Sequence, residues 1–355
     1  MSALLKGLVA DGEPGLAVLV RRSGRTVFER GVGVRELRTL QQIDARTRFR
    51  LASVTKQMTA AAIMLLVRDG RLRYEDALTK ALPGFPAYGS GVTIRHLLTH
   101  TSGLPDYEQL MENAEQEKGP LWSPERQILD HEVLVLLEKE THGLFAPGTS
   151  WAYSNSGYVV LGLVAERAGG RPFGDVLRER IFAPLRVTST LAYEKSRNEI
   201  PERAYGHTKG PTGFRETDQS PTSATLGDGG VYSCLEDLAK WDEALRTNAL
   251  LSEAEMAPAL TPVRLADGSE PRWPRREEGG DNLFPGRPVA YGFGWFLDPW
   301  RGRKRAWHHG ETMGFRSIVE RFPADGVTVI VLANRGDLDL KSLALEIAAG
   351  ELGRR

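Results

Sequence analysis

The sequence of 355 residues has only one cysteine, Cys234. A single cysteine excludes a disulfide within the chain and any metal site that needs two thiolates. We expect this cysteine to be an inert, buried thiol. The Gly-x-Ser-x-Gly string that marks the nucleophile of α/β-hydrolases is also absent. An ordinary α/β-hydrolase is therefore excluded.

Excess charge of either sign is also missing, because 46 Lys and Arg residues balance 46 Asp and Glu residues. A protein that binds nucleic acid or an anionic membrane usually carries a basic excess. We therefore expect neither a nucleic-acid nor a membrane partner. The local basic runs at 272–276 and 301–305 are interpreted as solvated loops.

The chain lacks a long apolar run. The longest strongly apolar stretch, 59–67, is about half as long as a membrane span requires. Residues 1–11 include Lys6 but not the apolar stretch that is typical of an export signal. These absences predict a cytoplasmic protein.

Strand patterns occur near both ends of the chain. Residues 16–20 and 26–28 flank the turn sequence Ser23-Gly24-Arg25, which predicts a β-hairpin. Near the C-terminus, runs rich in Val, Ile, Phe, Tyr and Trp are separated by Gly and Pro. These runs predict strands at 291–297, 315–322 and 327–332.

Helical patterns fill the middle of the chain, where apolar residues recur at helical spacing. The segments concerned are 55–68, 132–139, 156–168 and 236–246. Another helical pattern, at 338–352, closes the chain. Three start signals accompany them: a proline at the first helical position in 123–124, and capping boxes at 233–236 and 252–255.

Strands at both ends with helices between them predict an α/β (α+β) fold, in which one antiparallel sheet is built from both ends of the chain. We expect a discontinuous sheet domain, 1–80 and 225–355, and a mostly helical domain, 81–224. The stretch 265–288 is dense in Gly, Pro, Arg and Glu and predicts a long surface loop.

The first chemical motif is Ser-x-x-Lys at Ser53 and Lys56, where a short segment runs into a strong helical pattern. Residues three apart on a helix share a face, so the two side chains can meet. A helix N-terminus favours a developing anion, and a desolvated lysine can accept a serine proton. Alone, the motif is weak, because such a serine often only caps the helix.

Two further motifs follow in chain order. Tyr153-x-Asn155 is the only Tyr-x-Asn string, and His308-x-Gly310 is the only His-x-Gly string. Without the other motifs, Tyr153 and Asn155 would be interpreted as a turn before a helix.

His96 and His100 are four residues apart, a spacing that can bind zinc on a helix. No His-Glu-x-x-His string occurs anywhere. We therefore interpret these two histidines as structural.

The order Ser-x-x-Lys, Tyr-x-Asn, His-x-Gly resembles the serine β-lactamase and penicillin-binding-protein superfamily, and most closely its class C β-lactamase-like branch. Further segments carry the resemblance, which spans roughly 15–335. These segments are 48–60, 97–105, 147–157, 229–233 and 291–295. The branch contains family VIII-type esterases, D-aminopeptidases, amide hydrolases and acyltransferases, and the resemblance implies a β-lactamase-like fold.

The resemblance implies a role for each residue of the first two motifs. Ser53 is the expected nucleophile, which forms an acyl-enzyme, and Lys56 is the partner that activates it. Tyr153 matches the tyrosine that acts as general base. Whether Lys56 or Tyr153 accepts the first proton stays open. Asn155 is expected to bind the substrate amide or to orient Lys56.

The third motif is expected to bind substrate. His308 stands where lactamases of the branch carry a lysine, and Gly310 would let the edge strand approach the substrate closely. The backbone N–H groups of Ser53 and Glu311 are the expected oxyanion hole. A lysine recognises the carboxylate common to β-lactams, whereas a histidine is mostly neutral near pH 7.

These observations predict a serine hydrolase that cleaves small esters or amides, with weak or no β-lactamase activity. The alternatives are a β-lactamase or D-Ala-D-Ala or D-amino-acid peptidase, an acyltransferase, or an inactive binding protein of the same fold. We expect a small-molecule ester, amide or lactam as the substrate and neither a metal nor an organic cofactor. The oligomeric state stays open.

Overall fold

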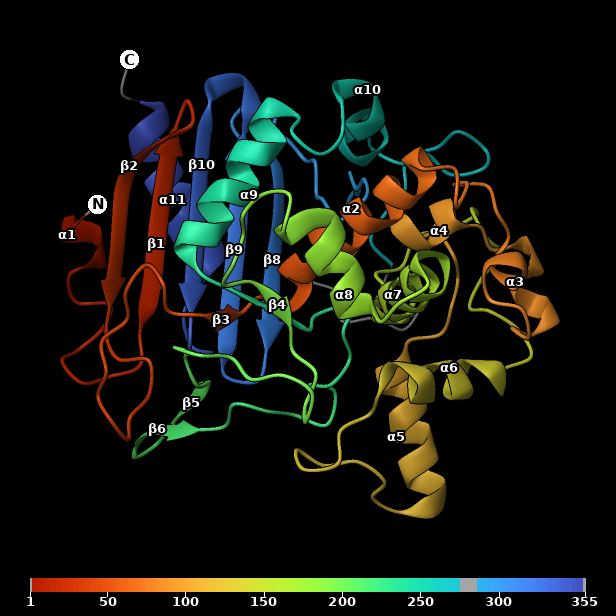
Figure 1. Cartoon of the computed structure of the whole chain (residues 1–355), viewed down its shortest axis with the longest axis horizontal. Coiled ribbons are helices and arrows are strands. Elements are labelled where there is room, and N and C mark those ends of the chain that lie inside the picture. Colours follow the sequence, from red (N-terminus) through yellow and green to blue (C-terminus); the bar gives the residue numbers. More distant parts are fainter. Residues whose placement is uncertain (1, 275–285, 354–355) are drawn as a thin grey trace.

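The computed structural model describes residues 2–274 and 286–353. Its largest sheet has five antiparallel strands in the order β2-β1-β10-β9-β8. These strands are β1 (Leu16–Arg22), β2 (Arg25–Val32), β8 (Ala306–Thr312), β9 (Phe315–Phe322) and β10 (Val327–Ala333). In Figure 1 the red N-terminal strands lie beside the blue C-terminal strands. The prediction of one sheet built from both ends of the chain is confirmed.

The N-terminal hairpin forms at the predicted turn. Ser23 and Gly24 both have positive φ angles, 50° and 81°, which suits the right-handed twist of the two strands. On its other side β1 pairs antiparallel with β10, from Leu16 opposite Ala333 to Arg22 opposite Val327. The centre of the sheet therefore joins residues that are more than 300 positions apart.

The sheet is covered on both faces. Helix α11 (Leu340–Leu352) packs on one face and helix α9 (Leu235–Thr247) on the other. Figure 1 shows α9 in front of the strands and α11 behind them. Alternate side chains of β1 enter the two separate cores, because successive strand residues point to opposite faces. This two-sided burial explains why residues 16–20 of β1 form a continuous apolar run.

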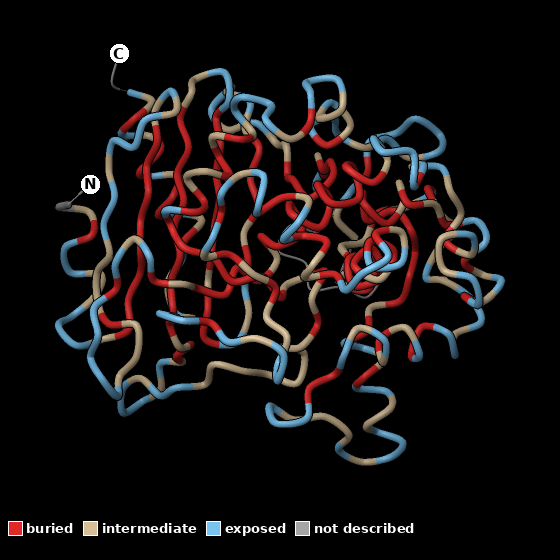
Figure 2. The backbone as a smooth tube through the Cα atoms, viewed as in Figure 1, coloured by how far each residue is buried: buried red, intermediate tan, exposed pale blue. Residues whose placement is uncertain are grey.

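Helix α2 (Thr55–Arg68) lies between the sheet and the helices within residues 78–169 (Figure 1). Its residues 55–66 are all buried, and it packs against α7 (Asn155–Gly169). A helix that is buried all round lies inside a protein. Figure 2 shows the buried backbone running through the strands and these central helices. Thr55, the first residue of α2, therefore lies in the buried interior of the molecule.

The other elements are short. The helices are α1 (Ser2–Leu5), α3 (Leu78–Ala81), α4 (Ile94–Leu98), α5 (Tyr107–Lys118), α6 (Asp130–Glu138), α8 (Phe173–Leu177) and α10 (Glu253–Met256). The short strands are β3 (Phe49–Arg50), β4 (Leu191–Ala192), β5 (His207–Gly210), β6 (Gly213–Glu216) and β7 (Val231–Ser233). Single turns of other helix types are η1 (Ala52–Val54), η2 (Ala87–Gly91), η3 (Arg178–Phe182), η4 (Ala257–Leu260) and η6 (Pro323–Asp325).

The five predicted helices are present, and their ends differ from the predicted ends by at most two residues. The predicted strand at 291–297 is wrong. This segment forms only isolated bridges, because Gly294 turns the chain with a φ angle of 76°. The strand that pairs at this edge of the sheet is β8.

Two of the three helix start signals are also wrong. Ser123 closes a turn by accepting the N–H of Arg126, and α6 begins only at Asp130. The hydroxyl of Ser233 pairs with Thr190, so α9 begins at Leu235, and its N-cap residue Cys234 provides no side-chain cap. The capping box at 252–255 is confirmed.

The loop predicted at 265–288 falls partly outside the described residues, which omit 275–285. Its described parts contain neither a helix nor a strand. Within the described residues, none of the helices is both long enough and apolar enough to span a membrane. The division into a sheet domain and a helical domain stays a prediction.

Candidate active site

Ser53 lies in the single turn η1, directly before α2. Its hydroxyl Oγ is 3.0 Å from the ammonium Nζ of Lys56, one helical turn later. Ala52, the residue before the serine, has a φ angle of 46°, which is unusual for a residue with a side chain. The predicted contact between Ser53 and Lys56 is therefore present, at a strained entry into the helix.

Lys56 is completely buried, and three oxygen atoms surround its Nζ. They are the hydroxyl of Ser53 at 3.0 Å, Oδ1 of Asn155 at 2.8 Å and the backbone oxygen of Asp228 at 3.0 Å. A lysine ammonium has three N–H donors, so each donor has an acceptor. The rotation of Nζ is thus fixed, with one of its N–H bonds directed at the nucleophile.

Asn155 is brought to Lys56 as the sequence predicts, at the first position of α7. Asp228 was not predicted. It contributes its main-chain oxygen, and a backbone contact of this kind leaves no signal in the residue type. The neighbouring Gly227 approaches α7 so closely that a Cβ there would overlap the backbone of Tyr158.

Tyr153 precedes α7, whose N-cap is the next residue, Ser154. Nζ of Lys56 lies 4.9 Å from the centroid of the Tyr153 ring, within range of a cation–π interaction. The ring also stacks on Phe296, with centroids 6.5 Å apart and planes 7° apart. The structure thus places Tyr153 beside Lys56, as the motif predicts.

His100 contacts the backbone on both sides of Tyr153. Ser154 donates its N–H to Nδ1 of His100 at 3.1 Å, and Ala152 donates its N–H to the carbonyl oxygen of His100 at 3.0 Å. His96 instead accepts the N–H of Thr93, within the cap of α4. His96 therefore stabilises the start of α4, whereas His100 binds the segment around Tyr153.

Strand β8 packs directly against the turn of the nucleophile. A Cβ on Gly310 would overlap the carbonyl oxygen of Leu51 and would lie 3.0 Å from the N atom of Ser53. Ser317, opposite Gly310 on β9, donates its hydroxyl to the same carbonyl at 2.6 Å. Gly310 is thus needed for the close packing of β8 against η1. The sequence predicts the glycine for a close approach to the substrate, but the backbone of η1 is itself in contact at this position.

His308 is completely buried on β8. Its Nδ1 lies 2.7 Å from the carbonyl oxygen of His309, and its Nε2 lies 3.1 Å from the hydroxyl of Tyr291. A carbonyl can only accept, so Nδ1 carries the proton and Nε2 accepts from Tyr291. Burial, His309 and Lys56 together hold the pKa of His308 well below its usual value, so the ring is neutral near pH 7.

Glu311 follows on β8 with a half-exposed side chain. Its carboxylate lies between 3.6 and 3.8 Å from Lys341, Arg316 and His309. Of these groups, Lys341 on α11 and Arg316 on β9 are cations that attract the carboxylate, whereas burial lowers the pKa of His309 to about 4 and leaves its ring neutral near pH 7. The oxyanion role of the Glu311 N–H stays a prediction.

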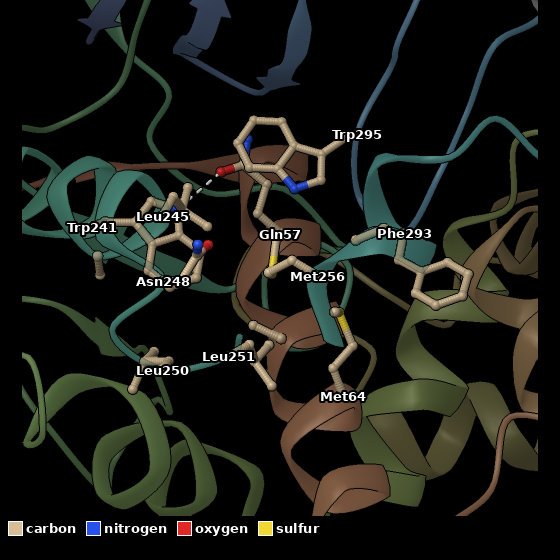
Figure 3. A pocket seen from close by; sticks show the side chains of 13 residues that line it. Gln57, Met64, Trp241, Leu245, Asn248, Leu250, Leu251, Met256, Phe293 and Trp295 are labelled. Atoms are coloured by element: carbon tan, nitrogen blue, oxygen red, sulfur yellow. Dashed lines mark hydrogen bonds between the residues drawn. The ribbon is translucent and has the colours of Figure 1, made fainter. Parts of the chain in front are cut away.

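A small pocket lies beside α2, as Figure 3 shows. Gln57, the neighbour of Lys56, accepts the indole N–H of Trp241 there at 3.2 Å. The space is about 20 Å³ for water-sized occupants, room for about one water molecule. None of the predicted site residues lines it, so it is separate from the reacting groups. The described residues also contain no group of three His, Cys, Asp or Glu side chains arranged to hold a metal ion.

The comparisons with known proteins agree over nearly the whole chain. The family model described as Beta-lactamase matches residues 1–351. Penicillin-binding protein 4* of Bacillus subtilis (strain 168) is 32% identical over 332 residues, which are 90% of this chain and 67% of that protein. A D-aminopeptidase of Cereibacter sphaeroides is 26% identical over 347 residues, 96% of this chain and 60% of that protein.

A similar solved structure is the D-amino acid amidase from Ochrobactrum anthropi SV3 complexed with L-phenylalanine amide. It is 25% identical to this chain, with a TM-score of 0.75, and the match covers 94% of this chain and 89% of the amidase chain. The chain spans about three fifths of the D-aminopeptidase and two thirds of penicillin-binding protein 4*.

Proposed function

Since the chain belongs to the beta-lactamase family and is a serine hydrolase, we propose that it cleaves small esters or amides through an acyl-enzyme at Ser53. The observation that carries this proposal is the contact of 3.0 Å between Oγ of Ser53 and Nζ of the buried Lys56. A serine hydroxyl is a weak nucleophile until a neighbouring base takes its proton.

The proposed reaction has two steps. In the first, Oγ of Ser53 attacks the carbonyl carbon, and its proton passes to Lys56 in its neutral amine form or to Tyr153 in its phenolate form. The bond to the alcohol or amine then breaks, and the leaving group takes that proton. In the second step water attacks the ester on Ser53 and gives a proton to the same base. The base returns this proton to Oγ of Ser53 as the bond to the acyl group breaks and the carboxylic acid leaves.

The N–H groups of Ser53 and Glu311 would stabilise the negative oxygen of each tetrahedral intermediate. The tight packing of Gly310 against η1 supports this proposal, because it holds β8 and the nucleophile turn together. The loss of one such donor typically costs about 100-fold or more in turnover.

Neutral His308 supports esters and amides over β-lactams. Lactamases of the resembling branch carry a lysine at this position, whereas this chain has a buried ring whose pKa is lowered. The site therefore lacks a fixed cation there to attract the carboxylate of an antibiotic. Replacing His308 by lysine should raise hydrolysis of a chromogenic cephalosporin relative to a p-nitrophenyl ester. An unchanged ratio would contradict the argument.

The central experiment uses a fluorophosphonate probe and p-nitrophenyl esters of increasing chain length, with Ser53→Ala as the matched variant. We expect one covalent adduct by intact mass on the wild-type chain, ester turnover, and neither in the variant. A wild-type chain that is neither labelled nor active would show that the hydrolase proposal is wrong and would favour an inactive binding protein.

Amides of amino acids are a second substrate class. The D-aminopeptidase relative and the D-amino acid amidase structure favour it. The p-nitroanilides of D- and L-phenylalanine test it directly. Faster release of p-nitroaniline from the D form would support a D-amino-acid preference, and release from neither would restrict the proposal to esters.

A further inference from the structure

His100 occupies an unusual position for a residue that serves only packing. It lies two residues after α4, is completely buried, and has a φ angle of 60° in the left-handed region. This conformation costs a residue with a side chain about 1–2 kcal/mol. Its ring nitrogen Nε2 is also buried without a hydrogen-bond partner among the described residues. The fold therefore keeps a polar ring at a place where an apolar ring would be less costly to bury.

Three contacts of His100 converge on Tyr153 and its two neighbours, and the ring also packs near Trp151, Tyr158 and Tyr291. The N–H groups that it binds belong to Ala152 and Ser154, the residues immediately before and after Tyr153. Its ring also packs on the ring of Tyr153, with centroids 4.4 Å apart and planes 35° apart. The backbone carbonyl, the side-chain nitrogen and the ring face of His100 thus each hold the same short segment.

The hydrogen bond to Ser154 requires a neutral ring. Nδ1 accepts a backbone N–H, so the proton of the imidazole must be on Nε2. Burial lowers the pKa of His100 well below its usual value, and the positive charge of Lys56 and the neighbouring His308 add to this effect. The buried surroundings that exclude water from Lys56 therefore also keep His100 neutral, the form in which Nδ1 can accept the N–H of Ser154.

We propose that His100 is the positioning residue of Tyr153: it clamps the backbone on both sides of this tyrosine and thereby holds the tyrosine ring against Lys56. This inference rests on the proposed function, in which Tyr153 serves as a base. His100 itself touches neither substrate nor nucleophile and acts only through Tyr153.

The side chains of asparagine and glutamine separate this role from simple packing. Oδ1 of asparagine takes the place of Nδ1, and asparagine tolerates positive φ. The oxygen of glutamine reaches instead toward the place of Nε2. His100→Asn should therefore keep the acceptor for Ser154, and His100→Gln should lose it although both variants remove the ring.

The experiment measures kcat and KM for a p-nitrophenyl ester together with melting temperatures. We expect His100→Asn to retain most of kcat. His100→Gln should lose about 100-fold in kcat with little change in KM, the size of effect that a misplacement of about 1 Å produces. His131, an exposed residue on α6, supplies the control variant His131→Gln, which should behave as wild type.

A second comparison uses Tyr153→Phe. Adding His100→Gln to this variant should cause no further loss of kcat, because residues that act through one another are not additive. Equal loss in the Asn and Gln variants, loss that follows the melting temperature, or full additivity with Tyr153→Phe would overturn the inference. Failure of the proposed function is distinguishable, since the wild-type chain would then be inactive and unlabelled.

Discussion

Replacing Gly310 by alanine is the sharpest test of the site, because it adds one carbon atom between β8 and the nucleophile turn. That Cβ would overlap the carbonyl oxygen of Leu51, and it would lie 2.5 Å from Oγ of Ser317 and 3.0 Å from N of Ser53. The carbonyl belongs to the backbone and already accepts a hydrogen bond from Ser317. The strand and the turn must therefore separate by about 1 Å before the contact becomes ordinary.

The expected effect follows from this separation. The proposed oxyanion donors lie on the two segments that move apart, the N–H of Ser53 on η1 and the N–H of Glu311 on β8. Loss of one donor costs about 100-fold to 1000-fold in kcat, or about 2.7–4 kcal/mol. Overpacking a buried site costs a further 1–3 kcal/mol, roughly, in the free energy of unfolding. We expect a folded but nearly inactive protein.

The assay combines kcat for a p-nitrophenyl ester with urea unfolding. Gly350→Ala on α11 is the matched control, because a Cβ there would meet no atom within 4 Å. The double variant Gly310→Ala with Ser317→Ala removes one of the overlaps but leaves the one with Leu51, so activity should stay low. Wild-type kcat in Gly310→Ala, or full recovery in the double variant, would refute the reasoning.

Two further predictions concern stability. Burial lowers the pKa values of His100 and His308, so the unfolded chain binds more protons than the folded chain between those lowered values and about pH 6.5. The contribution of these two histidines to the free energy of unfolding should therefore fall as the pH drops below about 6.5, whereas Glu108, whose pKa burial raises to about 7, acts in the opposite direction. The difference in urea unfolding between the wild type and a variant with His100→Asn and His308→Asn isolates the histidine contribution, and a difference that does not change with pH would contradict this. Asp242 forms buried ion pairs with Arg21 at 2.7 Å and Arg321 at 2.8 Å, so Asp242→Asn should lower the free energy of unfolding by about 3–5 kcal/mol. A loss below about 1 kcal/mol in urea unfolding would show that these pairs are worth no more than exposed ones.

The sequence predicts best what depends on local spacing. Ser53 and Lys56 are three residues apart on a strong helical pattern, and the structure brings their side chains to 3.0 Å. The N-terminal hairpin follows in the same way from its turn residues at 23–25. Such features are decided within one or two turns of chain, and patterns of residue type describe them well.

Features that depend on distant segments were missed. The segment 291–297 has the composition of a strand, but its Gly294 abuts the backbone of Lys56 and Gln57, and the resulting turn breaks the extended run. Ser233 matches a capping box, yet its hydroxyl is used by Thr190. In both cases a partner far along the chain overrides a local preference.

The contribution of Asp228 shows another limit of sequence reasoning. Its backbone oxygen completes the environment of Lys56, and any residue type offers the same atom. The sequence predicts a structural His100 because no His-Glu-x-x-His string occurs, and the segment that His100 contacts, 152–154, is about 50 positions away. A hydrogen bond to a main-chain group so far along the chain leaves no pattern of residue types in the sequence.

The pairing of β1 with β10 has a consequence for how the molecule is made. During synthesis the N-terminal hairpin emerges early, but the strand that it needs as a neighbour is the last of the sheet to leave the ribosome. Contacts between such distant segments form slowly, because a long loop must close before they contribute. A nascent chain that ends before residue 306 carries Ser53 and Lys56 but lacks β8, against which their turn packs. Hydrolytic activity should therefore appear only after β8 has left the ribosome, and a partly made protein would expose the unpaired edge of β1 to its neighbours.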